Sequence, residues 1–196
     1  MIILFMQLIV LLQALVTFFI VFDPIGSLPV FIELTKKFND TEKRKAVNKA
    51  VSVAGVLAFI FIFFGKNVLD FMGITFSSFK IAGGAVLFLL GLEMILGFKI
   101  HKKKVIDYSV AVSVISVPLI TGPGVITMAI FLASEIGILA TFISAFLSIS
   151  IIWILFKRAE RVQKKLGEAN LRIVSKIMGL IIASEGINLI ISVFSL

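Results

Sequence analysis

The chain has 196 residues, of which 60% are hydrophobic and 15% are charged, and its mean hydropathy is +1.16. A water-soluble domain of this length cannot bury so much apolar surface, because surface-to-volume scaling limits the share of residues that a fold can bury. We therefore expect much of the apolar surface to contact lipid. The net charge of +8 comes from short basic runs between apolar stretches, a pattern that indicates membrane topology and excludes a nucleic-acid partner.

The chain has no cysteine, and its single histidine, His101, lies in a lysine-rich loop. This composition excludes a disulfide framework, a thiolate or histidine-rich metal site, and a Ser-His or Cys-His catalytic pair. We therefore expect no metal, no cofactor and no enzyme. An intramembrane enzyme with two carboxylates stays a minor alternative.

Six apolar stretches, separated by charged or turn-forming clusters, have lengths near the roughly 20 helical residues that one bilayer crossing needs. They run over Ile2 to Phe22, Ala46 to Phe64, Ile81 to Gly97, Tyr108 to Ser134, Ile136 to Phe156 and Ile177 to Leu196. The first stretch has no basic residue before its apolar part, so we interpret it as a retained helix and not as a signal peptide. The sequence predicts an all-α polytopic membrane protein with six transmembrane helices.

The first stretch contains a break. It ends in Asp23-Pro24-Ile25-Gly26-Ser27-Leu28-Pro29 and then continues apolar, so its helix is expected to be interrupted, with a half-helix beginning near Ser27. A tight turn at the membrane surface is the alternative. Asp23 is expected to cap the half-helix, to bind a substrate ammonium group or to carry a proton.

The fourth stretch contains a second break. It runs for 27 residues without a charge but includes Pro118 and then Gly122-Pro123-Gly124, so a second half-helix is expected to begin near Val125. Helix breaks in a bilayer release backbone polar groups, which is costly unless those groups line a cavity or bind a ligand. The two breaks occupy corresponding positions, as in transporters with a site near the bilayer midplane.

The N-terminus of a helix carries a partial positive charge and free N–H donors, so each half-helix can receive a substrate carboxylate. Nearby hydroxyls can add hydrogen bonds, and glycines allow close approach to the backbone. The predicted substrate site consists of Asp23, Pro24, Gly26, Ser27, Thr121, Gly122, Pro123, Gly124 and Thr127.

Acidic residues inside the apolar stretches are candidates for ion coupling, because a charge at the bilayer centre costs at least about 2.5 kcal/mol. Glu93 lies towards one end of the third stretch and Glu185 nearer the middle of the sixth, with Asn188 one helical turn further on. Glu93 has an alternative role as an interfacial carboxylate that pairs with Lys99, and Glu185 as part of a packing network. With Asp23, these are the predicted coupling residues.

The loop charges predict the orientation of the chain. The loops after the first, third and fifth spans contain 17 lysines and arginines, whereas the other loops contain only Lys66 and Lys80. By the positive-inside rule, both termini face outward. The charged stretch Lys157 to Arg172 is interpreted either as a surface helix on anionic lipid or as a solvated linker.

An internal repeat divides the chain into two units of three spans. The segment Lys80-Ile-Ala-Gly-Gly is similar to Lys176-Ile-Met-Gly-Leu, and Pro24 corresponds to Pro123. Because each unit has an odd number of spans, the two copies must lie in opposite orientations. We predict one integrated transmembrane domain made of two inverted repeats, residues 1–104 and 105–196, with broken first and fourth helices.

The same motifs resemble those of the MarC family, also called the SnatA or small neutral amino-acid transporter family. The resemblance rests on Asp23 to Phe31, on Ile81-Ala82-Gly83-Gly84 with Leu92-Glu93-Met94-Ile95, and on Pro118 to Gly124 with Ile126-Thr127. It implies a prokaryotic inner-membrane protein of six spans that moves glycine- or alanine-type amino acids with proton coupling. It also implies that the two break motifs form the substrate site. The chain differs from the family at Ala183-Ser184-Glu185-Gly186, which leaves proton coupling through Glu185 open.

The sequence therefore predicts a secondary active transporter of small neutral amino acids, in which two three-helix halves alternate access to a midplane site. The lipid bilayer, a neutral amino acid and a second copy of the chain are the expected partners. A membrane scaffold or assembly protein without transport is the alternative from another functional class.

Overall fold

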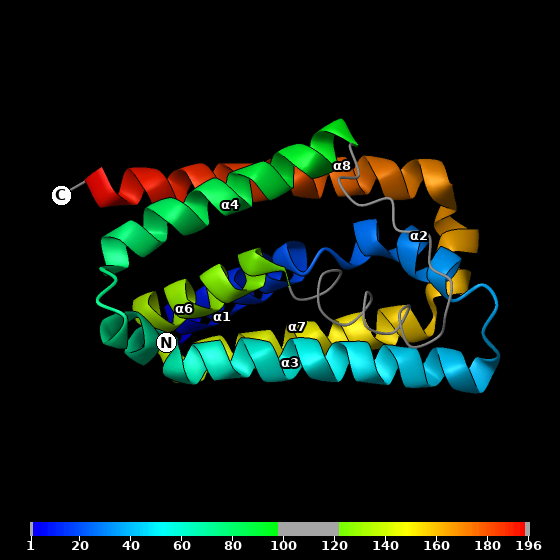
Figure 1. The fold of residues 1–196 in the computed structure, drawn as a ribbon, viewed down its shortest axis with the longest axis horizontal. Helices are drawn as coiled ribbons and strands as arrows, with labels where there is room; N and C mark the ends of the chain where they lie inside the picture. Colours follow the sequence, from blue (N-terminus) through cyan, green and yellow to red (C-terminus); the bar gives the residue numbers. More distant parts are fainter. Residues whose placement is uncertain (1, 98–121, 195–196) are drawn as a thin grey trace.

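The computed structural model describes residues 2–97 and 122–194, and every regular element in these ranges is an α-helix. Figure 1 shows the helices as an elongated bundle. The elements are α1 (Ile2–Val21), α2 (Pro24–Leu34), α3 (Asp40–Phe71), α4 (Phe76–Leu96), α6 (Pro123–Glu135), α7 (Ile138–Lys157) and α8 (Ala159–Phe194).

Five helical segments within the described residues are long and apolar enough to cross a membrane. The first of them, Phe5–Leu34, combines α1 and α2, which confirms that this stretch is interrupted and then resumes. The shorter α6 has 13 residues. The first part of the predicted fourth span, from Tyr108 to Thr121, lies outside the described residues.

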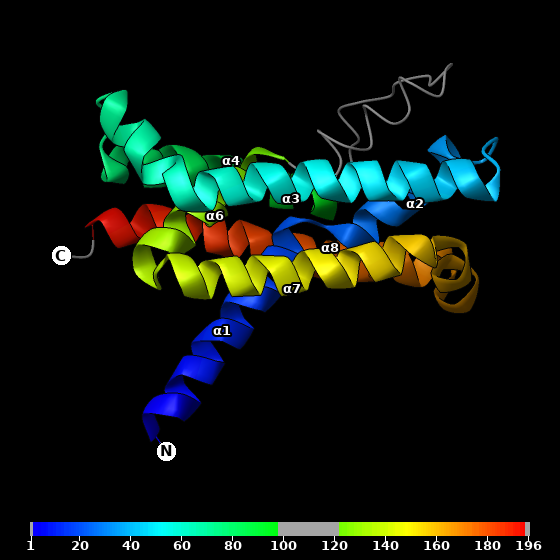
Figure 2. The ribbon, with the colours of Figure 1, turned by 90° about the horizontal axis from the view of Figure 1, so that it is seen from below.

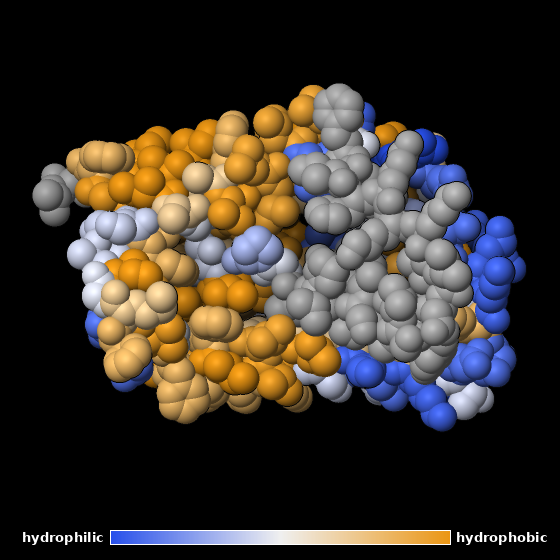
Figure 3. Space-filling view, in the orientation of Figure 1, coloured by the Kyte–Doolittle hydropathy of each residue, from blue (hydrophilic) through white to orange (hydrophobic). Residues whose placement is uncertain are grey.

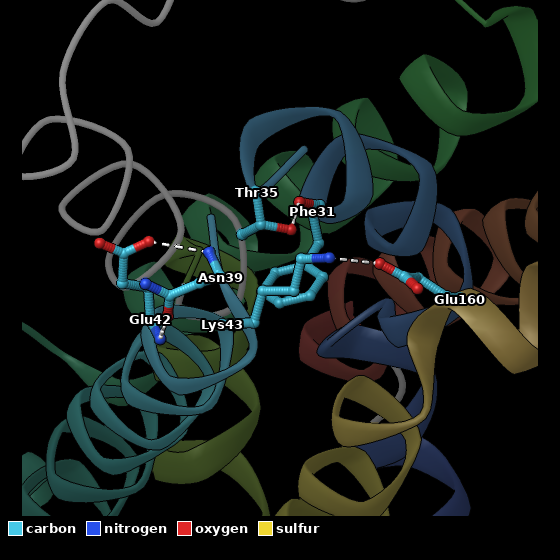
Figure 4. Close-up of polar contacts among 6 residues, drawn as sticks. All are labelled: Phe31, Thr35, Asn39, Glu42, Lys43 and Glu160. Carbon is cyan, nitrogen blue, oxygen red and sulfur yellow. Dashed lines mark hydrogen bonds and ion pairs between the residues drawn. The ribbon is translucent and has the colours of Figure 1, made fainter. Parts of the chain in front are cut away.

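Capping extends two helices beyond the apolar stretches of the sequence. Asn39 and Glu42 form a capping box at the start of α3, in which each side chain accepts a hydrogen bond from the other residue's backbone N–H, as Figure 4 shows. The Thr75 side chain accepts from the Ser78 N–H at the start of α4. The helices therefore begin at Asp40 and Phe76, ahead of the apolar stretches that start at Ala46 and Ile81.

The charged stretch before the last span is helical. α8 begins at Ala159, and only Gly167, with φ 76° and ψ 155°, has non-helical backbone angles inside it. This supports the interpretation of the stretch as a helix over that of a solvated linker. Gly167 changes the direction of the chain between the charged first part of α8 and its apolar remainder.

The antiparallel pair α4 and α8 has the closest backbone packing in the described structure. A methyl group placed on Gly186 would lie 2.5 Å from the Gly84 carbonyl oxygen, and one placed on Gly179 would lie 2.8 Å from the Gly91 carbonyl oxygen. The two glycines of each helix are seven residues apart, so they lie on one face. Small residues at these positions allow the two helices to touch through their main chains.

Hydroxyl groups connect α1 to α7. Ser144 Oγ donates to the Leu11 carbonyl at 3.1 Å, and Ser148 Oγ donates to the Leu15 carbonyl at 2.7 Å. Both serines are fully buried. Hydrogen bonds of this kind hold helices together in a membrane, where the hydrophobic effect between helices is absent.

Polar residues lie mainly at the two ends of the bundle. At the end where α2 leads into α3 and α7 into α8, Lys43 pairs with Glu160, as drawn in Figure 4. At the opposite end Lys80 pairs with Glu135 at 3.0 Å. Figure 3 shows apolar atoms over the middle of the drawn face and hydrophilic atoms gathered at the end near α2 and the start of α3.

Candidate functional site

The first break is one residue in left-handed conformation. Asp23 has φ 44° and ψ 56°, and its carboxylate accepts a hydrogen bond from the Gly26 N–H at 2.9 Å. Pro24 is the first residue of α2, where its missing N–H costs nothing. The half-helix therefore begins three residues earlier than expected, and the interpretation of Asp23 as an N-cap is confirmed.

The second half-helix starts without a side-chain cap. Gly122 is its N-cap, Pro123 is its first residue, and no side chain of the described residues accepts a hydrogen bond at this end. α6 thus begins two residues before the expected Val125. Further along, Thr127 turns its hydroxyl back to the Pro123 carbonyl at 3.0 Å, so that hydroxyl is already used within the helix.

The starts of the two half-helices lie close together. A methyl group placed on Gly124 would be 3.3 Å from Cγ1 of Val21, which is two residues before Asp23. Figure 1 shows α2 and α6 beginning near the middle of the molecule and running to opposite ends. The starts of α2 and α6 therefore lie within the length of the bundle and not at its ends. Two helix N-termini, each with partial positive charge, thus begin in the middle part of the bundle.

Each half-helix packs on the last helix of the other half of the sequence. A methyl group on Gly26 of α2 would lie 2.7 Å from Ser175 Oγ of α8. One on Gly83 of α4 would lie 3.0 Å from Thr127 Oγ1 of α6. Ser27 and Thr127 are both buried. Sequence reasoning missed Ser175, although its position before Lys176 in the repeated segment was a signal.

The remaining predicted residues do not gather at this place. Thr121 lies outside the described residues. Glu93 is half-buried near the end of α4, Glu185 is half-buried in α8, and Asn188 is exposed. Because Gly179 packs between Gly91 and Met94, Glu93 and Glu185 are separated by about six residues of helix rise, or about 9 Å. That spacing does not favour a shared reaction centre for the two carboxylates.

Comparison with known proteins gives a consistent family match. Residues 8–195 match a profile described as MarC family integral membrane protein. A membrane protein of Archaeoglobus fulgidus, classed as UPF0056, is 34% identical over 185 residues, which cover 89% of this chain and 87% of the relative. A UPF0056 protein of Methanocaldococcus jannaschii is also 34% identical, covering 89% of this chain and 90% of the relative.

A more distant relative, the UPF0056 membrane protein YhcE of Escherichia coli, is 27% identical and covers 89% of this chain and 86% of its own length. The names of these relatives state a membrane protein and no activity. No solved structure matches the chain.

Proposed function

The chain belongs to the MarC family of integral membrane proteins, and on that premise we propose that it is a secondary transporter of small neutral amino acids working by alternating access. The observation that supports the proposal is that α2 and α6, the helices that follow the two Pro/Gly motifs, both begin in the middle part of the bundle. Both helices begin there with a proline at their first position, so the positive ends of two helix dipoles lie in this part of the bundle.

The chemistry of that region suits a zwitterion. The helix N-termini favour a carboxylate, and the Asp23 carboxylate, on the same side of the break, favours an ammonium group. Gly26 touches Ser175, and Gly124 lies against Leu87 at 2.8 Å from an added methyl group. The tight packing of Gly26 against Ser175 and of Gly124 against Leu87 would exclude a large side chain, which fits substrates of the glycine or alanine type.

Two inverted repeats fit the way in which the helices pair. α2 packs on α8 and α6 packs on α4, so the contacts exchange when one half of the sequence replaces the other. α7 runs opposite to α3, and α8 opposite to α4, as the colour gradient in Figure 1 shows. Six spans in two inverted units, 1–104 and 105–196, would account for this exchange.

Coupling to protons is the finer part of the proposal. Asp23 is the leading carrier because it lies at the break itself, and Glu93, Glu185 and Asn188 are further candidates on α4 and α8. We place the protein in the cytoplasmic membrane of a prokaryote, with its basic end inside and its termini outside.

The test is uptake of labelled glycine and alanine into proteoliposomes, with and without an inward proton gradient. We expect saturable uptake that the gradient stimulates and that Asp23→Asn reduces at least tenfold. Asp70→Asn, at an exposed acid near the end of α3, is the matched control and should transport normally. Absence of saturable flux for both amino acids would overturn the transporter proposal, and unchanged flux in Asp23→Asn would remove Asp23 from the site.

A further inference from the structure

A groove of about 480 Å³ lies between α3 and α7, away from the two helix breaks. The two helices run side by side in Figure 2, and the groove follows their contact. Its lining includes Asn48, Ser52, Gly55 and Phe59 of α3, and Phe146 and Trp153 of α7. The groove is therefore polar near the basic end of the molecule and apolar towards the middle.

The polar end of the groove has a fixed hydrogen bond and a cation. Trp153 Nε1 donates to Asn48 Oδ1 at 2.8 Å, and Lys157 Nζ lies 3.4 Å from the centre of the Trp153 ring. Lys45 precedes Asn48 by three residues, so it lies one turn closer to the basic end on the same face of α3.

The two lysines at this end are not neutralised within the described residues. The ion pairs of the described residues join Lys43 to Glu160, Arg172 to Glu168 and, at the opposite end of the bundle, Lys80 to Glu135, so none involves Lys45 or Lys157. Lys157 thus lies against Trp153 at the polar end of the groove, and Lys45 lies one helical turn from Asn48 at the same end. Their charge is complementary to an anionic headgroup.

The length of the groove matches one leaflet of a bilayer. Asn48 and Phe59 are 11 residues apart, which corresponds to about 16 Å of helix, and half of a hydrocarbon core is about 15 Å. Gly55 has no side chain to fill the bottom of the groove, and a methyl group added there would meet nothing closer than Ile149 Cδ1 at 3.7 Å. An acyl chain can lie along the bottom of the groove towards Phe59 and Phe146.

From this combination we propose that the groove between α3 and α7 is a binding site for one anionic phospholipid of the leaflet at the basic end. The headgroup phosphate lies between Lys45 and Lys157, the Trp153 and Asn48 side chains stand at the level of the ester groups, and an acyl chain fills the apolar part. A zwitterionic lipid fits the same groove but gains less from the two ammonium groups. The site is separate from the proposed substrate region and does not depend on transport.

Trp153 makes this proposal directly testable because it is the only tryptophan of the chain. The full-length protein is reconstituted with phosphatidylglycerol or phosphatidylcholine whose acyl chains are brominated near the headgroup, and quenching of tryptophan fluorescence is measured against the mole fraction of brominated lipid. We expect phosphatidylglycerol to quench at a lower mole fraction. The expected preference is about fivefold for each lysine that contributes.

Variants distinguish a specific lipid-binding site from nonspecific attraction of anionic lipid to a basic surface. Lys45→Gln should lose most of the preference for phosphatidylglycerol without touching the tryptophan, and Gly55→Leu should reduce quenching by both lipids because it fills the bottom of the groove. Lys164→Gln, at a lysine of the charged part of α8, is the matched control and should keep the preference.

Three outcomes would overturn the proposal. The first is equal quenching by the two lipids, and the second is an equal loss of preference in Lys45→Gln and Lys164→Gln. The third is protection of Trp153 from both brominated lipids, which would indicate that a second copy of the chain covers the groove.

Discussion

Asp23 combines two properties that seldom occur in one residue. Its backbone has positive φ, which is costly for most side chains but tolerated by Asp and Asn, and its carboxylate closes the first turn of α2 through the Gly26 N–H. It is the only residue other than glycine with positive φ in residues 2–97 and 122–194. Asp23 is half-buried and lies between the end of α1 and the start of α2, so it fixes the geometry of the proposed site.

Substitutions at Asp23 should separate its structural role from its charge. Asn adopts the same backbone region and can accept the same hydrogen bond, so Asp23→Asn should unfold at nearly the wild-type temperature. Asp23→Ala loses the cap, worth about 1 kcal/mol, and adds a strain of roughly 1 to 2 kcal/mol from the left-handed backbone. Thermal unfolding in detergent, followed by circular dichroism, measures both. Equal stability of the Ala and Asn variants would contradict this account of the break.

At the level of helices, the sequence predicted the breaks better than it predicted the contacts. Proline and glycine restrict or relax the backbone at their own positions. Asp23-Pro24 and Gly122-Pro123 therefore predicted the starts of α2 and α6 to within three residues. The sequence did not predict that Gly179 and Gly186 form a helix interface, because the glycines that they contact, Gly84 and Gly91, lie about 95 residues earlier in the chain. The spacing of seven in both helices was visible, but nothing in one sequence says which faces meet.

The glycine contact between α4 and α8 should not tolerate even one added carbon. Gly186→Ala would place its methyl group 2.5 Å from the Gly84 carbonyl oxygen, a backbone atom that cannot rotate away. We expect it to destabilise the protein by about 1 to 3 kcal/mol through overpacking. The readout is the midpoint of thermal unfolding in detergent.

Gly55→Ala is the matched control for that substitution. It has the same chemistry in another helix, but its nearest new contact would be at 3.7 Å, and Ala favours helix over Gly by about 1 kcal/mol. This variant should be neutral or slightly more stable than the wild type. If both alanines had the same effect, the close approach of α4 to α8 would be wrong.

For the whole molecule, composition alone indicated a helical membrane protein, and the family match agrees. Two features needed three-dimensional information. The serines of α7 that bond to α1 are ordinary members of an apolar stretch, so their partners 133 residues away could not be read from the pattern. The groove beside Trp153 arises from residues of two helices that are distant in the sequence.

The orientation of the molecule can be checked with cysteine probes, because the chain has no cysteine of its own. Ser77→Cys places a thiol at the exposed start of α4, and Lys37→Cys places one at the basic end. In intact cells, a membrane-impermeant maleimide should label the variant at position 77 and should label the variant at position 37 only after the membrane is disrupted. Labelling of position 37 alone in intact cells would reverse the assigned orientation.

The hydroxyl bonds from α7 to α1 have a consequence for how access could alternate. These hydrogen bonds connect α1 to α7, and the close packing of glycines connects α4 to α8. Both sets of contacts therefore join one half of the sequence to the other. Alternating access by relative motion of the two sequence halves would therefore have to rearrange both sets of contacts. For the proposed transport cycle we expect relative motion between the α4–α8 pair and the group α1, α3 and α7, which are connected mainly through α2 and α6.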